Sequence, residues 1–499
     1  MVGQISRRNF IKFAVASGGA IVVGFDPGTR SWIPRARAET HSFQSVPKLD
    51  GMLLFDEPSR KAIAVDHSNL FHRIPAAVLK PTSVQDVVRI VRYANTHSLK
   101  VAIRGDGHSQ YGQTQAEGGI VIDSRTLNAI RVRSKNYFDA QPGAFWGDVA
   151  RATLPEGLTP PVYPATCMGL TVGGTLSVGG IGSTSHHHGA QVDTVTELDV
   201  VTGDGRLVTC SPSRESELFN MVLAGLGQCG IIVRARIRAI PAPSHVMLQD
   251  LIYRDLEKYL ADQKRMAADG RFDSQRGSGN RNTNGEWSFT VEVGKFFSSP
   301  DEPSLAPLTS GLQFDSAAAP TRITYWDYLF RFEAQNAAAL SNTRSRAYIT
   351  MWVRASVTKD YVSTILTLPP DLAGLPRVAG SERFAFNPLN TRRFTRPMFK
   401  VPGEDQAFAI WLFRSAPVGD QAALSALLAS NRELLAKMTA VGGKRYGPYS
   451  MVISPAEWEA HFGPDVWRRL SEAKKKFDSN HVLSPEPAMF GGRKQSSDA

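Results

Sequence analysis

A glycine-rich stretch around His108 has the residue types needed for chemistry on a flavin. It runs from residue 104 to residue 113 and reads Arg-Gly-Asp-Gly-His-Ser-Gln-Tyr-Gly-Gln. Gly105 and Gly107 let backbone N–H groups crowd against a pyrophosphate, and the imidazole of His108 is a neutral nucleophile near pH 7. We therefore expect the stretch to hold the phosphates of FAD and to place His108 where it can attack the methyl group on the flavin's benzenoid ring. An ordinary glycine-rich turn with a surface histidine is the alternative interpretation.

A second segment, 171–182, has the small residues that a flat cofactor needs beneath it. It contains five glycines together with Ser177. Glycine lacks the Cβ that would collide with such a ligand. This composition predicts a second cofactor-binding loop.

Two other patterns suggest ligands that the surrounding sequence argues against. Residues 225–230 match the dinucleotide fingerprint G-x-G-x-x-G, but a true fingerprint follows a strand and opens a helix. Here a predicted helix, 216–226, comes first and a predicted strand, 231–237, comes second, so we reject a nicotinamide site. The triplet His186–His188 could suggest a metal, yet adjacent residues of an extended segment point to alternate sides and cannot all ligate one ion. We expect no metal site.

Helix and strand patterns around the first stretch predict an α+β flavin domain. Residues 75–81 form an apolar run between prolines, which indicates a strand, and residues 84–97 carry apolar side chains at helical spacing. A strand over 100–104 then leads into the glycine-rich stretch. Further strands are predicted at 120–123, 198–202 and 231–240.

The sequence pattern changes beyond residue 245. Strand patterns such as 287–293 and 347–353 alternate with proline-rich turns, and one polar segment, 277–285, is interpreted as a mobile loop. We expect an α+β cap that covers the substrate and is inserted into a two-part FAD-binding domain. The predicted units are a leader over 1–38, the FAD-binding domain over 71–245, the cap over 246–445 and a return to the FAD domain over 446–499.

The N-terminus has the pattern of a twin-arginine export signal. Arg7 and Arg8 precede a weakly apolar run, and Ala36-Arg37-Ala38 is a small-x-small cleavage site. The run is shorter than the ~20 residues that a membrane span needs, and no other segment is expected to cross a bilayer. We expect cleavage after Ala38 and a periplasmic or secreted mature protein.

The formal net charge of +11 does not indicate a nucleic-acid partner. Residues 1–38 contribute five of these charges, and the rest are spread along the chain without a basic block. The three cysteines are too few and too irregularly spaced for a disulfide framework or a zinc site. We expect a small molecule, and not nucleic acid, as the partner.

As a set, the motifs resemble the FAD domain of the vanillyl-alcohol oxidase and p-cresol methylhydroxylase superfamily, and within it the cytokinin dehydrogenases. The similarity spans nearly the whole mature chain. The segments that carry it are 107–113, 118–123, 170–177, 197–203, 226–237, 253–263, 457–463 and 477–485. The resemblance implies a PCMH-type fold and an FAD-dependent oxidoreductase that takes a hydride from a C–H bond next to nitrogen or oxygen of a small molecule.

The resemblance also implies which residues contact FAD. His108 would bond to the flavin covalently. The other implied contacts are Gly105, Gly107, Ser109, Gln113, Thr171, Ser177, Ile181, Ile232, Tyr446 and Ser484. Glu486-Pro487 stands where the family has Gly-Gln after Ser-Pro, so one glutamine contact to the flavin is expected to be lost.

Three positions near the expected substrate site bear on the reaction. Cytokinin dehydrogenases carry an aspartate that acts on the substrate amine, and the aligned residue here is Thr166, which cannot accept a proton as a carboxylate does. A family glutamate at the substrate entrance corresponds to Arg276, which is either an attractor of anionic substrates or an exposed loop arginine. Cys167 has the spacing of the cysteine that bonds the flavin a second time in berberine bridge enzyme and related carbohydrate oxidases. A buried structural cysteine is the equal alternative.

These features predict an exported FAD-dependent dehydrogenase or oxidase similar to cytokinin dehydrogenase. Thr166 argues against cytokinins as its substrate. The electron acceptor is expected to be oxygen, a quinone or another compound. An alcohol or carbohydrate oxidase with doubly linked FAD is the second hypothesis, and a flavin carrier without catalysis is the third.

Overall fold

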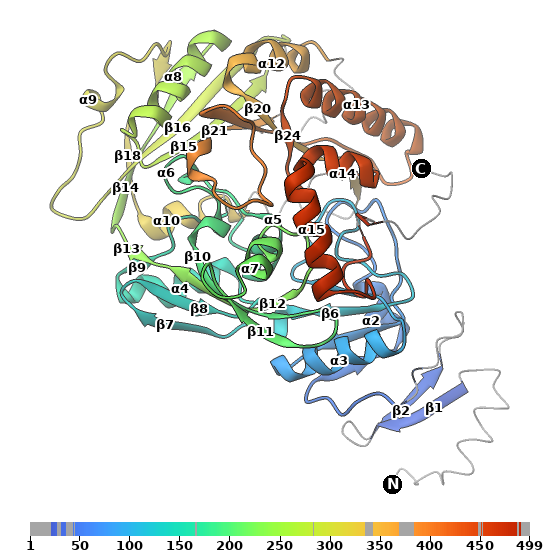
Figure 1. Ribbon diagram of the computed structural model, residues 1–499. Coiled ribbons are helices and arrows are strands. Elements are labelled where there is room, and N and C mark those ends of the chain that lie inside the picture. The colour runs from blue at the N-terminus through green and yellow to red at the C-terminus, as the bar shows by residue number, and fades with distance from the viewer. Residues whose placement is uncertain are drawn as a thin grey trace, which may run out of the picture.

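The structure, a computed structural model, covers most of the chain beyond residue 44 (Figure 1). The described residues are 21–26, 31–35, 43, 45–164, 167–282, 284–334, 343–368, 384–447, 451, 453–486 and 489–490. Near the N-terminus, strands β1 (Ile21–Asp26) and β2 (Ser31–Arg35) pair antiparallel. The twin arginines, the expected cleavage site and Thr166 lie outside the described residues.

A four-stranded sheet leads into the stretch around His108. Its strands, in order, are β3 (Met52–Leu54), β4 (Ala77–Lys80), β6 (Ile120–Asp123) and β5 (Val101–Arg104), of which the last three are parallel. Helix α3 (Val84–Thr96) connects β4 to β5, as its apolar spacing predicted. It begins at a capping box formed by Ser83 and Asp86. Because β5 ends at Arg104, the glycine-rich stretch begins where strand pairing stops.

A five-stranded antiparallel sheet forms the second N-terminal layer. Its strands, in order, are β11 (Leu207–Cys210), β10 (Val195–Val201), β12 (Ile231–Arg238), β8 (Tyr137–Ala140) and β7 (Ile130–Ser134). The accompanying helices are α4 (Trp146–Thr153), α5 (Val172–Val178), α7 (Ser216–Val222) and α15 (Pro464–Phe477). Helix α7 precedes residues 225–230 and β12 follows them, so the helix-before-strand order that excluded a nicotinamide fingerprint is confirmed.

A nine-stranded antiparallel sheet, the large sheet, organises the middle of the chain. Eight strands follow the order β17 (Ser316–Ala317), β14 (His245–Tyr253), β16 (Trp287–Phe297), β15 (Ser274–Arg281), β21 (Phe384–Asn390), β22 (Gln406–Leu412), β20 (Ile349–Arg354) and β24 (Lys444–Arg445), while β18 (Thr321–Thr324) also pairs with β14. Three helices share a hydrophobic core with one face of the large sheet: α8 (Leu256–Asp269), α12 (Thr358–Leu366) and α13 (Gln421–Ala440) (Figure 1). On the other face, Ala385 and Leu389 join the core of the five-stranded sheet. The strands β21, β22 and β20 of the large sheet are therefore buried on both faces.

The polar segment 277–285 was predicted as a mobile loop, and that prediction was wrong for residues 277–281, which form a strand. Its first half belongs to β15, which pairs with β16 on one side and β21 on the other. A Cβ at Gly277 would lie 2.4 Å from the Tyr259 hydroxyl oxygen, and one at Gly279 would lie 2.1 Å from the Phe384 ring. These glycines permit close packing within a sheet, which composition alone does not distinguish from flexibility.

The C-terminal segment returns to the two N-terminal sheets. Helix α14 (Pro455–Phe462) leads into α15, which contacts α7 (Figure 1). Leu483 then forms a parallel bridge with Val101 of β5. Shorter elements are α2 (Glu57–Ala62), β9 (Leu158–Thr159), α6 (Ser185–His188), β13 (Ile240–Pro241), α9 (Ala306–Thr309), α10 (Tyr325–Phe330), β19 (Arg344–Arg346) and β23 (Ser415–Pro417). Within the described ranges, no helix is long and apolar enough to span a bilayer.

Candidate active site

His108 occupies a half-buried position whose surroundings keep its imidazole neutral. Its ring stacks on the ring of His67, with centroids 4.1 Å apart and planes inclined by 12°. The backbone N–H of His67 donates to the Gly107 carbonyl at 2.8 Å, which holds the two segments together. Burial lowers the pKa of His108 to about 4, so the ring is unprotonated at neutral pH. A neutral imidazole is the nucleophilic form.

A buried carboxylate, Asp66, anchors the backbone that follows His108. It accepts hydrogen bonds from the Ser109 hydroxyl at 3.1 Å and from the Gly112 backbone N–H at 2.7 Å. The Ser68 hydroxyl is a third donor, at 2.5 Å. Burial raises the pKa of Asp66 despite these donors, because desolvation penalises the charged form. No sequence pattern indicates this role, since Asp66 lies 42 positions before His108.

The two glycine-rich segments lie directly against each other. A Cβ at Gly105 would fall 2.0 Å from the Thr171 hydroxyl oxygen, so this approach requires glycine. The second segment was predicted as a loop, but its residues Val172–Val178 form helix α5 and the prediction was wrong there. Buried apolar side chains on α5 outweigh the low helix propensity of its glycines.

Hydrogen bonds bring distant parts of the chain to these segments. The Tyr446 hydroxyl accepts from the Gly180 backbone N–H at 3.2 Å, and the Gln113 amide donates to the Gly447 carbonyl at 2.9 Å. The backbone N–H of Ser484 donates to β5 at 2.8 Å. Three other expected cofactor residues lie on or beside the elements of this region. Ser177 is on α5, Ile181 follows α5, and Ile232 is buried in β12.

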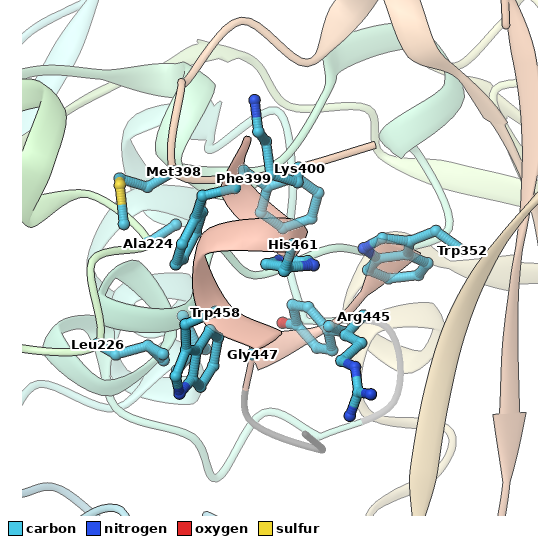
Figure 2. Close-up of a pocket in the computed structure, with 13 residues that line it drawn as sticks. Ala224, Leu226, Trp352, Met398, Phe399, Lys400, Arg445, Gly447, Trp458 and His461 are labelled. Carbon is cyan, nitrogen blue, oxygen red and sulfur yellow. The ribbon is translucent and has the colours of Figure 1, made fainter. Parts of the chain in front are cut away.

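A small cavity adjoins the second segment (Figure 2). It contains about 280 Å³ of empty space, part of it open to solvent, and its walls include Trp352, Phe399, Tyr446, Trp458 and His461. A Cβ at Gly179 would lie 2.0 Å from the Phe399 ring, so the glycine segment and the cavity wall touch. Figure 2 shows the Lys400 side chain directed away from the rings. Six of its thirteen lining residues carry rings, and Lys400 and Arg445 are its charged members.

The surroundings of Cys167 disfavour a thiolate. Burial raises the pKa of its thiol to about 11, and the carboxylates of Glu333 and Asp106 act in the same direction. A protonated thiol is a poor nucleophile. This environment therefore counts against the second covalent flavin bond that the spacing of Cys167 suggested.

Arg276 lies in β15 and not in an exposed loop. Its guanidinium sits over the ring of Phe332, 4.6 Å from the centroid, and Glu292 is its partner across the strand register. Glu292 also accepts a hydrogen bond from Arg331 at 2.7 Å. The guanidinium is thus part of a charged cluster, and its capture of an anionic substrate stays a prediction.

Two buried polar side chains on the large sheet were not singled out from the sequence. Asn387 is 4% exposed and Thr350 is 1% exposed. Neither the Asn387 carbonyl oxygen nor the Thr350 hydroxyl has a hydrogen-bond partner among the described residues. Strand alternation places them on the face of Ala385 and Trp352, toward the five-stranded sheet. Only the strand register could have identified them, because their spacing matches no motif.

Comparisons with known proteins cover both the glycine-rich segments and the large sheet. Residues 75–211 match the family described as FAD binding domain, and residues 273–490 match the family described as Cytokinin dehydrogenase 1, FAD and cytokinin binding. The uncharacterized oxidoreductase ORF5 in fasciation locus from Rhodococcoides fascians is 34% identical over 88% of this chain and 98% of its own length. Cytokinin dehydrogenase 7 from Oryza sativa subsp. japonica is 33% identical over 88% of this chain and 91% of its own length. Cytokinin dehydrogenase 9 from the same organism is 31% identical over 89% of this chain and 91% of its own length.

Proposed function

Because the chain belongs to the cytokinin dehydrogenase family of FAD-dependent oxidoreductases, we propose that it oxidises a C–H bond next to nitrogen or oxygen of a small molecule, using a flavin tethered to His108. The observation that supports this covalent tether is the neutral imidazole of His108, whose ring stacks on that of His67. An unprotonated ring can form a covalent bond to a flavin.

Residues 75–211 match the FAD-binding family, and both glycine-rich segments lie inside that range. The close approach of Gly105 to Thr171 and of Gly179 to Phe399 leaves no room for larger side chains at the two glycines. Bound FAD supplies the hydride-accepting chemistry, while the protein supplies position and polarity. Asp66 restrains the backbone beside His108, and Tyr446 connects the second segment to the large sheet.

We propose an amine with an oxidisable C–H bond beside nitrogen as the substrate class. The relatives' names support it, since several are cytokinin dehydrogenases. Thr166 in place of the family aspartate argues that cytokinins themselves are not the preferred amines. An alcohol or carbohydrate oxidase with doubly linked FAD is the second candidate, which the protonated thiol of Cys167 disfavours.

Two measurements test this function. Protein expressed with ample riboflavin and precipitated with trichloroacetic acid is expected to stay yellow, because a covalent flavin survives denaturation. Anaerobic bleaching of the flavin with isopentenyladenine, other allylic amines, aryl alcohols and sugars then identifies the substrate class. Bleaching by amines alone supports the proposal, whereas bleaching by sugars or aryl alcohols alone supports the second candidate. A flavin that only dithionite reduces would indicate a carrier.

We also propose export by the twin-arginine route and reoxidation by oxygen or a quinone. The sequence pattern around Arg7, Arg8 and Ala38 supports the export. Replacing both arginines by lysine is expected to leave uncleaved precursor in the cytoplasm, which the mass of the purified protein reports. Stopped-flow reoxidation of the reduced flavin with each acceptor identifies the second substrate.

A further inference from the structure

A buried arginine lies against the segment that carries the stacking partner of His108. Arg346 is the last residue of strand β19, and its Nη1 donates to the His67 carbonyl at 2.9 Å. The backbone N–H of Arg346 donates to the Ser68 carbonyl at 2.7 Å. Arg346 is 4% exposed, and Ser68 is buried. Two hydrogen bonds from one residue therefore hold consecutive carbonyls of a segment that lies 279 residues earlier in the chain.

The residues that follow Arg346 contact the chain on the other side of His108. The hydroxyl of Tyr111, a buried residue, donates to the Tyr348 carbonyl at 2.9 Å. The Tyr348 ring also lies 6.0 Å from the His67 ring, measured between centroids. Residues 346–348 therefore contact both the segment that stacks on His108 and the segment that follows it.

The guanidinium of Arg346 restrains the His67 ring through the backbone. The His67 backbone N–H donates to the Gly107 carbonyl at 2.8 Å, and the His67 ring stacks on His108 with centroids 4.1 Å apart. A hydrogen bond from a charged donor is roughly twice as strong as one between neutral groups. The bond from Arg346 to the His67 carbonyl is therefore well suited to keep the stack in place.

The charge of Arg346 also favours the nucleophilic form of His108. Burial is the larger cause of the lowered pKa of His108, and the positive charge of Arg346 lowers that pKa further. A protonated imidazole cannot attack carbon, since its lone pair is occupied. A cation at this place is therefore compatible with a nucleophile at His108, whereas a carboxylate would favour the protonated ring.

We propose that Arg346 is a positioning residue for the covalent bond between His108 and FAD. This role rests on the proposed function, and Arg346 acts on the reaction through His67. In the attachment, a C–H bond of the flavin methyl group breaks and a C–N bond to His108 forms. The two electrons and two hydrogens, one from the methyl group and one from the imidazole, stay on the flavin until oxygen takes them up as hydrogen peroxide. A displaced His108 ring attaches more slowly, because the attacking nitrogen must be aligned with the methyl carbon.

Two variants of Arg346 test this role on full-length apoprotein to which FAD is added. Arg346→Met keeps much of the side-chain bulk but donates no hydrogen bond, so acid-stable flavin is expected to form several-fold more slowly, as in His67→Ala. Arg346→Lys keeps a charged donor and should attach flavin at close to the wild-type rate. Arg344→Met is the matched control, because this arginine of the same strand bonds to Ser415, and it should also keep the wild-type rate.

The fraction of bound flavin that resists trichloroacetic acid distinguishes attachment from folding. A variant that does not fold loses covalent and non-covalent flavin together, whereas a positioning defect lowers only the acid-stable fraction. Adding Arg346→Met to His67→Ala should slow attachment no further than His67→Ala alone, because both changes remove one interaction.

The outcomes separate this role from the proposed function. A wild type without acid-stable flavin would overturn the tether to His108 and the role of Arg346 with it. A wild type with acid-stable flavin would overturn only the role of Arg346 in any of three cases. These are a wild-type rate in Arg346→Met, an Arg346→Lys variant as slow as His67→Ala, and additive slowing in the double variant.

Discussion

The imidazoles of His67 and His108 stack with their centroids 4.1 Å apart. This contact places an aromatic face against the side chain that we propose to hold the flavin. It comes from a segment 41 residues earlier in the chain, which the backbone bond from His67 to Gly107 ties to the glycine-rich stretch. The position of His108 and its neutral state are therefore both consequences of tertiary packing.

Replacing His108 by alanine should abolish covalent flavin attachment. The variant His108→Ala removes the nucleophile, so trichloroacetic acid is expected to release all yellow colour into the supernatant. His97→Ala, which removes an exposed histidine of a helix end, serves as the control and should keep its flavin in the pellet. Pigment retained by denatured His108→Ala would show that another residue forms the bond.

Replacing His67 distinguishes stacking from other roles of that ring. His67→Phe preserves an aromatic face and should incorporate flavin at close to the wild-type rate. His67→Ala removes this face and should slow flavin incorporation several-fold, because the His108 ring then loses the ring on which it stacks. The measurement is acid-stable absorbance against time after addition of FAD to apoprotein. Equal rates for the two variants would exclude a stacking role.

Cys167 should be dispensable for the flavin. With a thiol pKa of about 11, it is protonated at neutral pH, so Cys167→Ala is expected to retain acid-stable flavin with an unchanged absorption spectrum. A spectral shift in the variant would reveal a second covalent bond and favour the oxidase candidate.

Adding one methyl group at Gly179 should loosen the cofactor site. Gly179 has φ +114°, and a Cβ there would lie 2.0 Å from the Phe399 ring. We expect Gly179→Ala to cost about 1–3 kcal/mol of unfolding free energy and to lower flavin content. Gly403→Ala is the matched control, because its Cβ would meet nothing within 4 Å. Urea unfolding and the ratio of flavin to protein absorbance measure both effects, and equal losses in the two variants would contradict the packing argument.

The buried histidine His186 should make the protein less stable in mild acid. Burial lowers its pKa in the folded state to about 3 from the ordinary 6.5. Below pH 6.5 the unfolded chain binds a proton there that the folded chain does not, so this contribution to stability is lost as pH falls from about 6.5 toward the folded pKa, by about 1.4 kcal/mol per pH unit.

Urea midpoints between pH 7.5 and pH 5 test this dependence. The variant His186→Gln should flatten the pH slope of the unfolding free energy by about one proton. His97→Gln, in which the histidine replaced is exposed, should keep the wild-type slope. A wild-type slope in His186→Gln would mean that His186 is accessible to protons in the folded state.

The cofactor class and the family could be predicted from the sequence because their signals are local. Gly105, Gly107 and His108 lie within four residues of one another, and backbone freedom and nucleophilicity are properties of residue type. The strand and helix that deliver them follow from the spacing of apolar side chains. The order of helix and strand around residues 225–230 excluded a nicotinamide fingerprint for the same reason.

Glycine-rich segments were less predictable, because composition does not distinguish close packing from flexibility. The segment 277–285 has glycines where neighbouring strands and rings approach. The segment 171–182 has two of its five glycines on helix α5 and three just after it. In each case the deciding contact is with a side chain distant in sequence.

Sequence alone thus determined the chemistry that this protein carries, an imidazole among glycines suited to a flavin. Only the tertiary structure decided the protonation of Cys167, the stacking partner of His108 and the placement of Arg346. Those properties depend on charges and rings that the fold brings together, such as Arg346 beside His67 across 279 residues. Electrostatic and van der Waals interactions depend on distance in space, which the order of residues does not state.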